Sequence, residues 1–337
     1  MNTLTISRKS LLNARFQRVC RAVGSLFIFF VHNRKIEVYI VPSQKTGVIV
    51  AIFAYIIWGV FPIFWKQLTM VDSLEVLFSR IIWAFVFTTI YVIVIGQGKL
   101  LWQDLIGLAQ NKGQLIRLFL ASIFITVNWG VFIWAVKENH ILQSSLGYYI
   151  NPLLLVLFGV IFFKEKLERY TIVAIVIAAV GVLIMTISYG EVPWIALTLA
   201  LTFGIYGVLK KKVTLDATRG LAIETMFITP FAIIGYIIIG QSTPLSFIND
   251  GTWISTLLIL GGILTAIPLV LFATGAQAIP LYLIGFIQFI GPTISFCIGV
   301  FMYGEPFTKV ELMAFSCIWT AVIIFSVCKT LEVRKAH

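Results

Sequence analysis

Charged residues are scarce in this chain of 337 residues. Asp, Glu, Lys and Arg make up 12% of it, whereas soluble domains carry about 25%. Hydrophobic residues make up 60%, and the mean hydropathy is +1.00. This composition excludes an ordinary soluble domain. The length is therefore better interpreted as a number of membrane spans, each of roughly 20 apolar residues, than as a number of soluble domains.

The chain also lacks the motifs of common catalytic and metal sites. It has three His and four Cys, with no CxxC spacing. It contains no HExxH, no GxxxxGK[ST] and no dinucleotide-binding fingerprint, and GQGK at 96–99 is too short for a P-loop. The sequence therefore predicts no cofactor, no metal site and no catalytic residues, and it argues against ATP-driven transport. The cysteines are Cys20, Cys297, Cys317 and Cys328.

Residues 1–44 differ from the rest of the chain. Basic residues surround one short apolar run, Ala22 to Val31, which is too short to span a membrane. HNRK follows that run where a signal peptide would have a small-residue cleavage site, so a cleaved signal is disfavoured. We expect a disordered or surface-lying basic extension, or an over-long gene model.

Apolar runs of spanning length follow one another from Gly47 onward. They divide the chain into a first unit at 45–190, a second unit at 191–328 and a basic tail at 329–337. We predict an all-α integral membrane protein with ten transmembrane helices and no nucleic-acid partner. The expected spans are 47–66, 74–95, 115–136, 141–163, 170–188, 193–210, 221–240, 254–276, 281–303 and 309–328.

One stretch of the chain occurs twice. Ser144 to Leu167 is echoed by Ile284 to Phe307, 140 residues later and without a gap. Pro152 falls on Pro292 at this offset, and Glu165 falls on Glu305. Ten spans then divide into two repeats of five, and an odd number per repeat makes the second copy cross the membrane in the opposite direction. The sequence therefore predicts two inverted five-helix repeats, as in many secondary transporters.

The placement of Lys and Arg predicts the orientation in the membrane. With the N-terminus in the cytoplasm, 21 of these residues lie in or beside the cytoplasmic segments and three lie outside. Positively charged loops stay in the cytoplasm, so both termini are expected there. The net charge of +11 is then a topology signal, and the partner that it implies is a lipid bilayer.

Arg80 lies about two turns inside the second expected span. A charge at this depth costs on the order of 2.5–3.5 kcal/mol on insertion scales, so it predicts a substrate-binding role toward an anionic or electron-rich group. Glu75 or Glu224 are candidate partners for it, and the alternative is that Arg80 reaches back to the interface. Asn128 and Trp129 lie in the third span, where Asn128 either binds substrate or hydrogen-bonds a neighbouring helix.

The repeated stretches supply further candidate residues at membrane depth. Tyr148 and Asn151 share a helix face, and Gln288 lies in the echo. Each stretch has a proline inside a span, and interrupted helices at matching places in two halves mark midplane binding sites. The alternative is that these prolines only kink the helices. The expected helix breaks are Pro152, Pro268 and Pro292.

Glu165 and Glu305 follow a span by a few residues, one at each face of the membrane. We expect each carboxylate to accept hydrogen bonds from the free amides that open the next helix.

Several stretches resemble a known family. AYIIWGVFPIFWK, NWGVFIWAVKENHILQSSLGYYINPL and GFIQFIGPTISFCIGVFMYGEPF are similar to the RarD branch of the EamA drug/metabolite transporters, and KKKVTLDATRGLAIETMFITP fits the same pattern. The resemblance covers Lys45 to the C-terminus. It implies a ten-helix permease with inverted repeats in the bacterial cytoplasmic membrane, and it supplies no catalytic residues.

The leading hypothesis is a multi-pass secondary transporter of small metabolites or drugs in the bacterial inner membrane, working by alternating access. The sequence does not name the substrate and leaves open whether the protein forms a homodimer. The alternative is an integral-membrane enzyme acting on a lipid or lipid-linked substrate. Its acid and base groups would be Lys137, Glu138 and His140, which share one turn without a partner motif.

Overall fold

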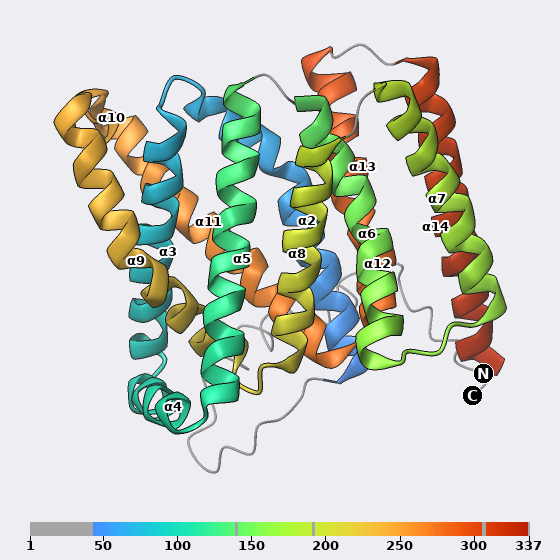
Figure 1. Ribbon diagram of the computed structural model, residues 1–337, viewed down its shortest axis with the longest axis horizontal. Coiled ribbons are helices and arrows are strands. Elements are labelled where there is room, and N and C mark those ends of the chain that lie inside the picture. Colours follow the sequence, from blue (N-terminus) through green and yellow to red (C-terminus); the bar gives the residue numbers. More distant parts are fainter. Residues whose placement is uncertain (1–42, 139–140, 191–192, 305–307, 336–337) are drawn as a thin grey trace, which may run out of the picture.

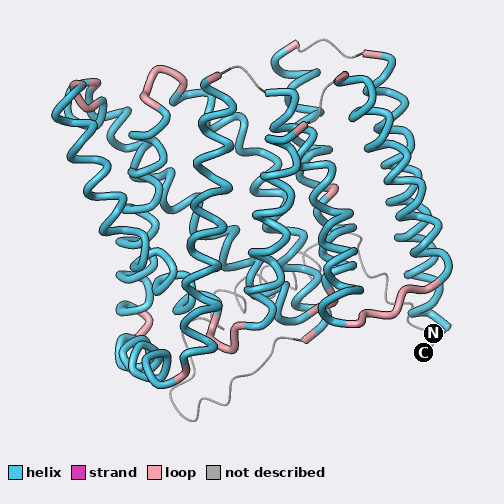
Figure 2. The backbone as a smooth tube through the Cα atoms, in the orientation of Figure 1, coloured by secondary structure: helices cyan, strands magenta, loops and turns pink. Residues whose placement is uncertain are grey.

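The computed structural model describes residues 43–138, 141–190, 193–304 and 308–335. Within these ranges the regular structure is entirely helical (Figure 2). Residues 1–42, which hold almost all of the expected N-terminal extension, lie outside them. The helices are α2 (Gln44–Trp65), η1 (Lys66–Leu68), α3 (Ser73–Val94), α4 (Gly98–Gln110), α5 (Lys112–Lys137), α6 (Ile141–Phe163), α7 (Arg169–Tyr189), α8 (Trp194–Lys212), α9 (Ala217–Ser242), α10 (Ser246–Asn249), α11 (Gly251–Ala278), α12 (Leu281–Gln288), α13 (Ile290–Cys297), η2 (Ile298–Met302) and α14 (Lys309–Lys335).

Ten helical segments of the described chain are long and apolar enough to cross a membrane. Each corresponds to one expected span, with α12, α13 and η2 together forming the ninth. The prediction of an all-α protein with ten spanning helices is thus confirmed. The ends differ by a few residues, and α9 begins at Ala217, four residues before the expected start. Glu224 therefore lies deeper inside its helix than the sequence indicated.

The second spanning helix of each half begins in the same way. Asp72 precedes α3, and its carboxylate accepts hydrogen bonds from the backbone N–H groups of Leu74 and Glu75. Asp216 precedes α9 and accepts from Thr218 and Arg219. An aspartate in this position satisfies amide donors that have no partner inside the helix and stabilises the positive end of the helix dipole.

Figure 1 shows the helices side by side in a broad bundle, with α2 and α8 near the middle. The most extensive helix contacts all join a helix before residue 190 to one after residue 193, for example α7 with α14, α3 with α9 and α6 with α8. The two halves of the sequence are therefore intermeshed in one bundle. The shorter helix α4 lies across the lower ends of α3 and α5 (Figure 1).

The three prolines that were expected to break helices differ in their effect. The ninth span is interrupted at Phe289, between α12 and α13, three residues before Pro292. In contrast, α6 and α11 continue through Pro152 and Pro268. A proline removes one backbone donor, and in a membrane the neighbouring helices can satisfy the carbonyl that it frees, so the helix persists. The expected breaks at Pro152 and Pro268 are therefore wrong.

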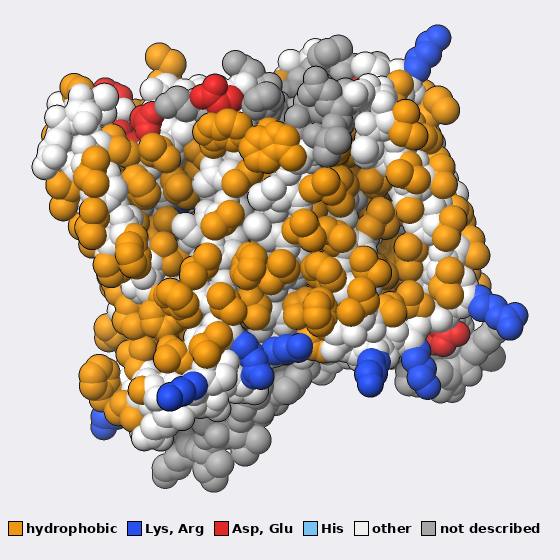
Figure 3. Space-filling model, in the orientation of Figure 1, with side chains coloured by type: hydrophobic (Ala, Val, Ile, Leu, Met, Phe, Trp, Pro, Cys, Tyr) orange, Lys and Arg blue, Asp and Glu red, His pale blue; other side chains and the backbone are white. Residues whose placement is uncertain are grey.

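The surface seen in Figure 3 is a broad apolar band. On this face the Lys and Arg side chains gather mainly along the lower edge, and the acidic side chains gather mainly along the upper edge (Figure 3). Such a band is what lipid tails require, because exposed polar groups are costly there.

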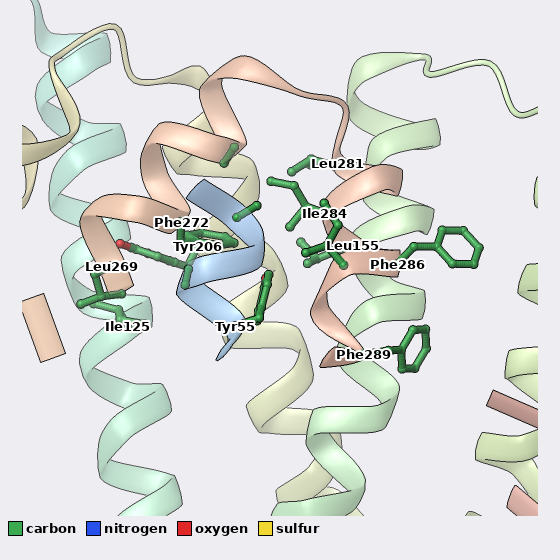
Figure 4. Packing of buried hydrophobic residues seen from close by; sticks show 14 of the residues in the cluster. Tyr55, Ile125, Leu155, Tyr206, Leu269, Phe272, Leu281, Ile284, Phe286 and Phe289 are labelled. Atoms are coloured by element: carbon green, nitrogen blue, oxygen red, sulfur yellow. The ribbon is translucent and has the colours of Figure 1, made fainter. Parts of the chain in front are cut away.

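The interior contains one large cluster of buried apolar side chains from both halves of the chain. Tyr55 of α2, Tyr206 of α8 and Phe272 of α11 are among its most buried members (Figure 4). Where α6 crosses α12, Gly285 is needed for close approach, since a Cβ there would lie 2.6 Å from the carbonyl oxygen of Pro152. Small residues at such crossings are typical of membrane helix pairs.

Candidate functional site

Arg80 is the eighth residue of α3 and is 7% exposed. Its Nε donates a hydrogen bond to Oγ1 of Thr265 on α11, at 3.1 Å. The Thr265 hydroxyl donates in turn to the carbonyl oxygen of Gly261, at 2.7 Å, which leaves its lone pairs to accept from Arg80. A residue of the second half thus orients the guanidinium of the first.

Two indole rings lie against this guanidinium. The Arg80 Cζ is 4.6 Å from the ring centroid of Trp65, the last residue of α2, and 4.9 Å from that of Trp129 on α5. Cation–π contacts of this kind contribute about 0.5–2 kcal/mol each. They stabilise the charge without neutralising it, because an aromatic ring carries no net charge.

Tyr148 of α6 completes the cluster. It interacts electrostatically with Arg80, and its ring packs edge-on against Phe132 of α5. Tyr148 is 43% exposed, so it is the accessible member of a group whose central cation is buried. We call Arg80, Trp65, Trp129, Tyr148 and Thr265 the Arg80 cluster.

The carboxylates that the sequence offered as partners of Arg80 lie elsewhere. Glu75 accepts hydrogen bonds from the backbone N–H groups of Ser246 and Phe247, at 3.0 and 2.9 Å. Glu224 pairs with Lys210, at 2.5 Å. Among the described residues no ion pair includes Arg80, and its one hydrogen bond uses Nε. Both terminal NH₂ groups of the guanidinium therefore retain donors for a ligand.

Asn128 and Asn151 both bind the backbone of α8. The Asn128 side chain donates to the carbonyl oxygen of Leu199, at 2.8 Å, and to Oγ1 of Thr202, at 2.9 Å. Asn151 donates to the carbonyl oxygen of Ala200, at 3.1 Å, while its own Oδ1 is buried without a hydrogen-bond partner. Asn128 is thus engaged in the interhelical contact that was the alternative reading. Asn151 makes such a contact through its amide nitrogen, and its Oδ1 can still accept a hydrogen bond.

Gln288, the last residue of α12, lies in a second group of side chains. It is 4% exposed and accepts a hydrogen bond from the Tyr55 hydroxyl, at 3.4 Å. Tyr55 packs against Trp58 and Phe272. The structure therefore brings three of the expected site residues together, namely Arg80, Trp129 and Tyr148, and gives Asn128, Asn151 and Gln288 other partners.

Two members of the Arg80 cluster were not expected from the sequence. Trp65 ends a span, and a tryptophan at that place is typical of the aromatic belt at the membrane interface. Thr265 is one of several threonines in apolar helices and carries no signal of its own. Only the packing of α11 against both α2 and α3 identifies them.

Glu165 caps a helix, but a different one from that expected. Its carboxylate accepts from the N–H groups of Leu281 and Tyr282, at 2.8 and 3.0 Å, which open α12 in the other half. The expected target was α7, the next helix in the chain. Glu305 lies outside the described residues, as does His140 of the alternative enzymatic site.

These features define a class of protein: a multi-pass membrane protein with a buried cation held between helices of its two halves. Residues 45–187 and 192–327 each match the sequence model of the EamA-like transporter family. The chain therefore belongs to the EamA-like transporter family.

Individual relatives agree with this assignment. The chain is 47% identical to "Uncharacterized transporter YojE" of Bacillus subtilis (strain 168), over 88% of this chain and 99% of that protein. It is 37% identical to "Protein RarD" of Escherichia coli (strain K12), over 84% of this chain and 94% of the relative. The expected resemblance to RarD-type members is thus confirmed, and the chain is a bacterial-type multi-pass membrane protein of a transporter family.

A solved structure also matches the fold. It aligns with a TM-score of 0.65 at 15% identity, covering 85% of this chain and 99% of the matched chain. At this level of identity the match supports the fold alone.

Proposed function

We propose that this protein is a secondary transporter that carries a small anionic metabolite across the bacterial cytoplasmic membrane by alternating access. The observation that carries the proposal is the Arg80 cluster. A buried guanidinium in an apolar helix is costly, and among the described residues it has no carboxylate to offset its charge. Helices of both halves surround it, so a relative movement of the halves changes its surroundings.

The chemistry of the cluster favours an anion with two oxygen atoms at one end. A guanidinium presents paired N–H donors that match a carboxylate or phosphate group. The indoles of Trp65 and Trp129 lie against the guanidinium, and its terminal NH₂ groups keep their donors for the ligand. Tyr148, which is partly exposed, is the accessible side chain of the cluster.

The proposal includes two inverted repeats and cytoplasmic termini. The two family matches, each of five spanning helices, support the repeats. The 21 to 3 bias of Lys and Arg supports an orientation in which the lower edge of Figure 3 faces the cytoplasm.

The test is uptake into proteoliposomes that contain the purified protein. Vesicles with and without protein are incubated in a bacterial metabolite extract, and the accumulated compounds are compared without preselection. The compounds that wild-type protein accumulates are expected to carry a carboxylate or phosphate group. Accumulation of neutral or cationic compounds alone would contradict the proposal.

Two substitutions then connect uptake to the cluster. Arg80→Gln is expected to lower uptake of those compounds roughly 10- to 100-fold, because a hydrogen bond to a charged group contributes about 1.5–3 kcal/mol. Arg80→Lys keeps the charge but loses the paired donors, so an intermediate loss is expected. Lys329→Gln, at the partly exposed pair with Glu332, is the matched control and should leave uptake unchanged. Uptake by Arg80→Gln within twofold of wild type would overturn the assignment.

A further inference from the structure

A buried ion pair lies in the bundle outside the Arg80 cluster. Lys210 of α8 and Glu224 of α9 form an ion pair at 2.5 Å, and each side chain is 1% exposed. The Tyr206 hydroxyl donates to the other carboxylate oxygen of Glu224, at 3.4 Å. An ion pair buried this completely often contributes less stability than two apolar side chains of similar size. A contribution to stability is therefore a weak explanation for the presence of this ion pair.

Glu224 occupies the position in its helix that Arg80 occupies in the other half. Asp72 caps α3 and Arg80 follows eight residues later, while Asp216 caps α9 and Glu224 follows eight residues later. α3 and α9 are each the second spanning helix of a family match, and they pack against one another. The two halves thus carry opposite charges at corresponding positions.

A row of aromatic rings connects the ion pair to Gln288, one of the expected site residues. Tyr206 stacks on Phe272, with ring centroids 5.9 Å apart and planes at 17°. Phe272 packs edge-on against Tyr55, and the Tyr55 hydroxyl donates to Gln288. Figure 4 shows Tyr206, Phe272 and Tyr55 close together in the core. Contacts between neighbouring side chains therefore link Glu224 to Gln288 at the end of α12.

Few other ionisable groups are close enough to compensate Glu224. The helices packed against α9 are α3, α4, α5 and α11, and α11 carries no charged residue. Arg219 on α9 itself binds Asp104 and Gln97. Within the described chain, Lys210 and Tyr206 are the ionisable groups that contact Glu224. The ionisable groups on the other helices are Glu75, Arg80 and Tyr91 on α3, Lys99 and Asp104 on α4, and Lys112, Arg117 and Lys137 on α5.

We propose that Glu224 is a proton-binding site that couples proton movement to transport of the anion. A proton from the aqueous phase adds to a carboxylate oxygen of Glu224, and the only bond formed is that O–H bond. Lys210 keeps its charge and loses its counter-ion, so the protein carries one more positive charge, which offsets the negative charge of the anion bound at the Arg80 cluster. Release of the proton at the other face restores the ion pair. One proton and one negative charge then cross together, so the transport of a monoanion is electrically neutral.

This inference rests on the proposed transport function, but its test needs no substrate. Proteoliposomes on a solid-supported membrane are exposed to a step from pH 7.5 to pH 6.0, and the transient charge displacement is recorded. The wild-type protein is expected to give a transient that protein-free liposomes lack. Glu224→Gln should reduce the displaced charge at least fivefold.

Glu75→Gln is the matched control. Glu75 is 2% exposed, and its carboxylate oxygens accept from backbone amides and Tyr236 without a lysine partner. Its substitution should preserve the transient. Because Glu224→Gln leaves Lys210 buried without a counter-ion, the double variant Lys210→Met/Glu224→Gln is measured as well. It removes both charges and should also lack the transient. Its elution as a single species in size-exclusion chromatography would show that it is folded.

The outcomes separate this inference from the proposed function. A wild-type transient that persists in Glu224→Gln and in the double variant would overturn it, as would the absence of any protein-dependent transient. If either occurs while uptake still depends on Arg80, the anion transporter stands without proton coupling at Glu224. If uptake does not depend on Arg80 but the transient depends on Glu224, the proposed substrate site fails and the proton site remains.

Discussion

Removal of the Glu165 carboxylate is expected to loosen the contact between the two halves of the bundle. Glu165 follows α6 and caps the first amides of α12, which has no acidic residue in its own first turn. Lys211 of α8 reinforces the contact. Its Nζ lies 3.6 Å from the carboxylate and donates to the carbonyl oxygen of Ile279, at 2.5 Å. Glu165→Ala removes both acceptors and the counter-charge of Lys211.

The magnitude follows from these contacts. Loss of a side chain that caps a helix costs about 0.5–2 kcal/mol. Loss of a negative charge at a helix N-terminus adds about 0.3–1 kcal/mol. The Glu165 side chain is 10% exposed, so water replaces these interactions poorly. We therefore expect Glu165→Ala to lower the free energy of unfolding by about 1–3 kcal/mol, and Glu165→Gln by about half as much because one acceptor remains.

The free energy of unfolding can be measured by SDS titration in mixed micelles or by steric trapping in bicelles. Lys329→Gln is the control, since Lys329 forms its ion pair with Glu332 on the same helix, Glu332 is 44% exposed, and such pairs contribute little. A free energy for Glu165→Ala within about 0.5 kcal/mol of wild type would refute the argument that this carboxylate joins the halves.

Two further predictions concern packing inside the bundle. Lys210→Met leaves Glu224 buried without a counter-ion and should cost about 3–5 kcal/mol, whereas Lys210→Met/Glu224→Leu should cost less than that single change. If the costs of Lys210→Met and Glu224→Leu simply add in the double variant, the two residues are not a coupled pair. Gly285→Ala should cost about 1–3 kcal/mol because the new Cβ meets the Pro152 carbonyl. Gly107→Ala in α4, where a Cβ meets nothing within 4 Å, should be neutral or stabilising, and thermal unfolding of both variants checks the contrast.

The sequence by itself determined the features that can be identified along the chain without knowledge of how the helices pack. Apolar runs of about 20 residues are long enough to mark spans without any knowledge of their neighbours. The 140-residue echo and the bias of Lys and Arg are equally independent of packing. The apolar runs predicted ten spans, and the ten spanning helices agree. Arg80 was identifiable in the same way, because a charge within an apolar run is anomalous wherever the run packs.

Only the tertiary structure decided which residues meet. Glu165 was correctly expected to cap a helix, yet its target lies 116 residues away, at α12. Asn151 and Tyr148 lie on one helix, but Asn151 binds α8 while Tyr148 lies near Arg80. Trp65 lies against that cation because α2 and α3 both pack against α11. The physical reason is that lipid-facing and helix-facing surfaces in a membrane are equally apolar, so hydropathy does not reveal how each helix is rotated about its axis. The rotation, and with it every side-chain partner, is set by close packing between helices distant in the chain.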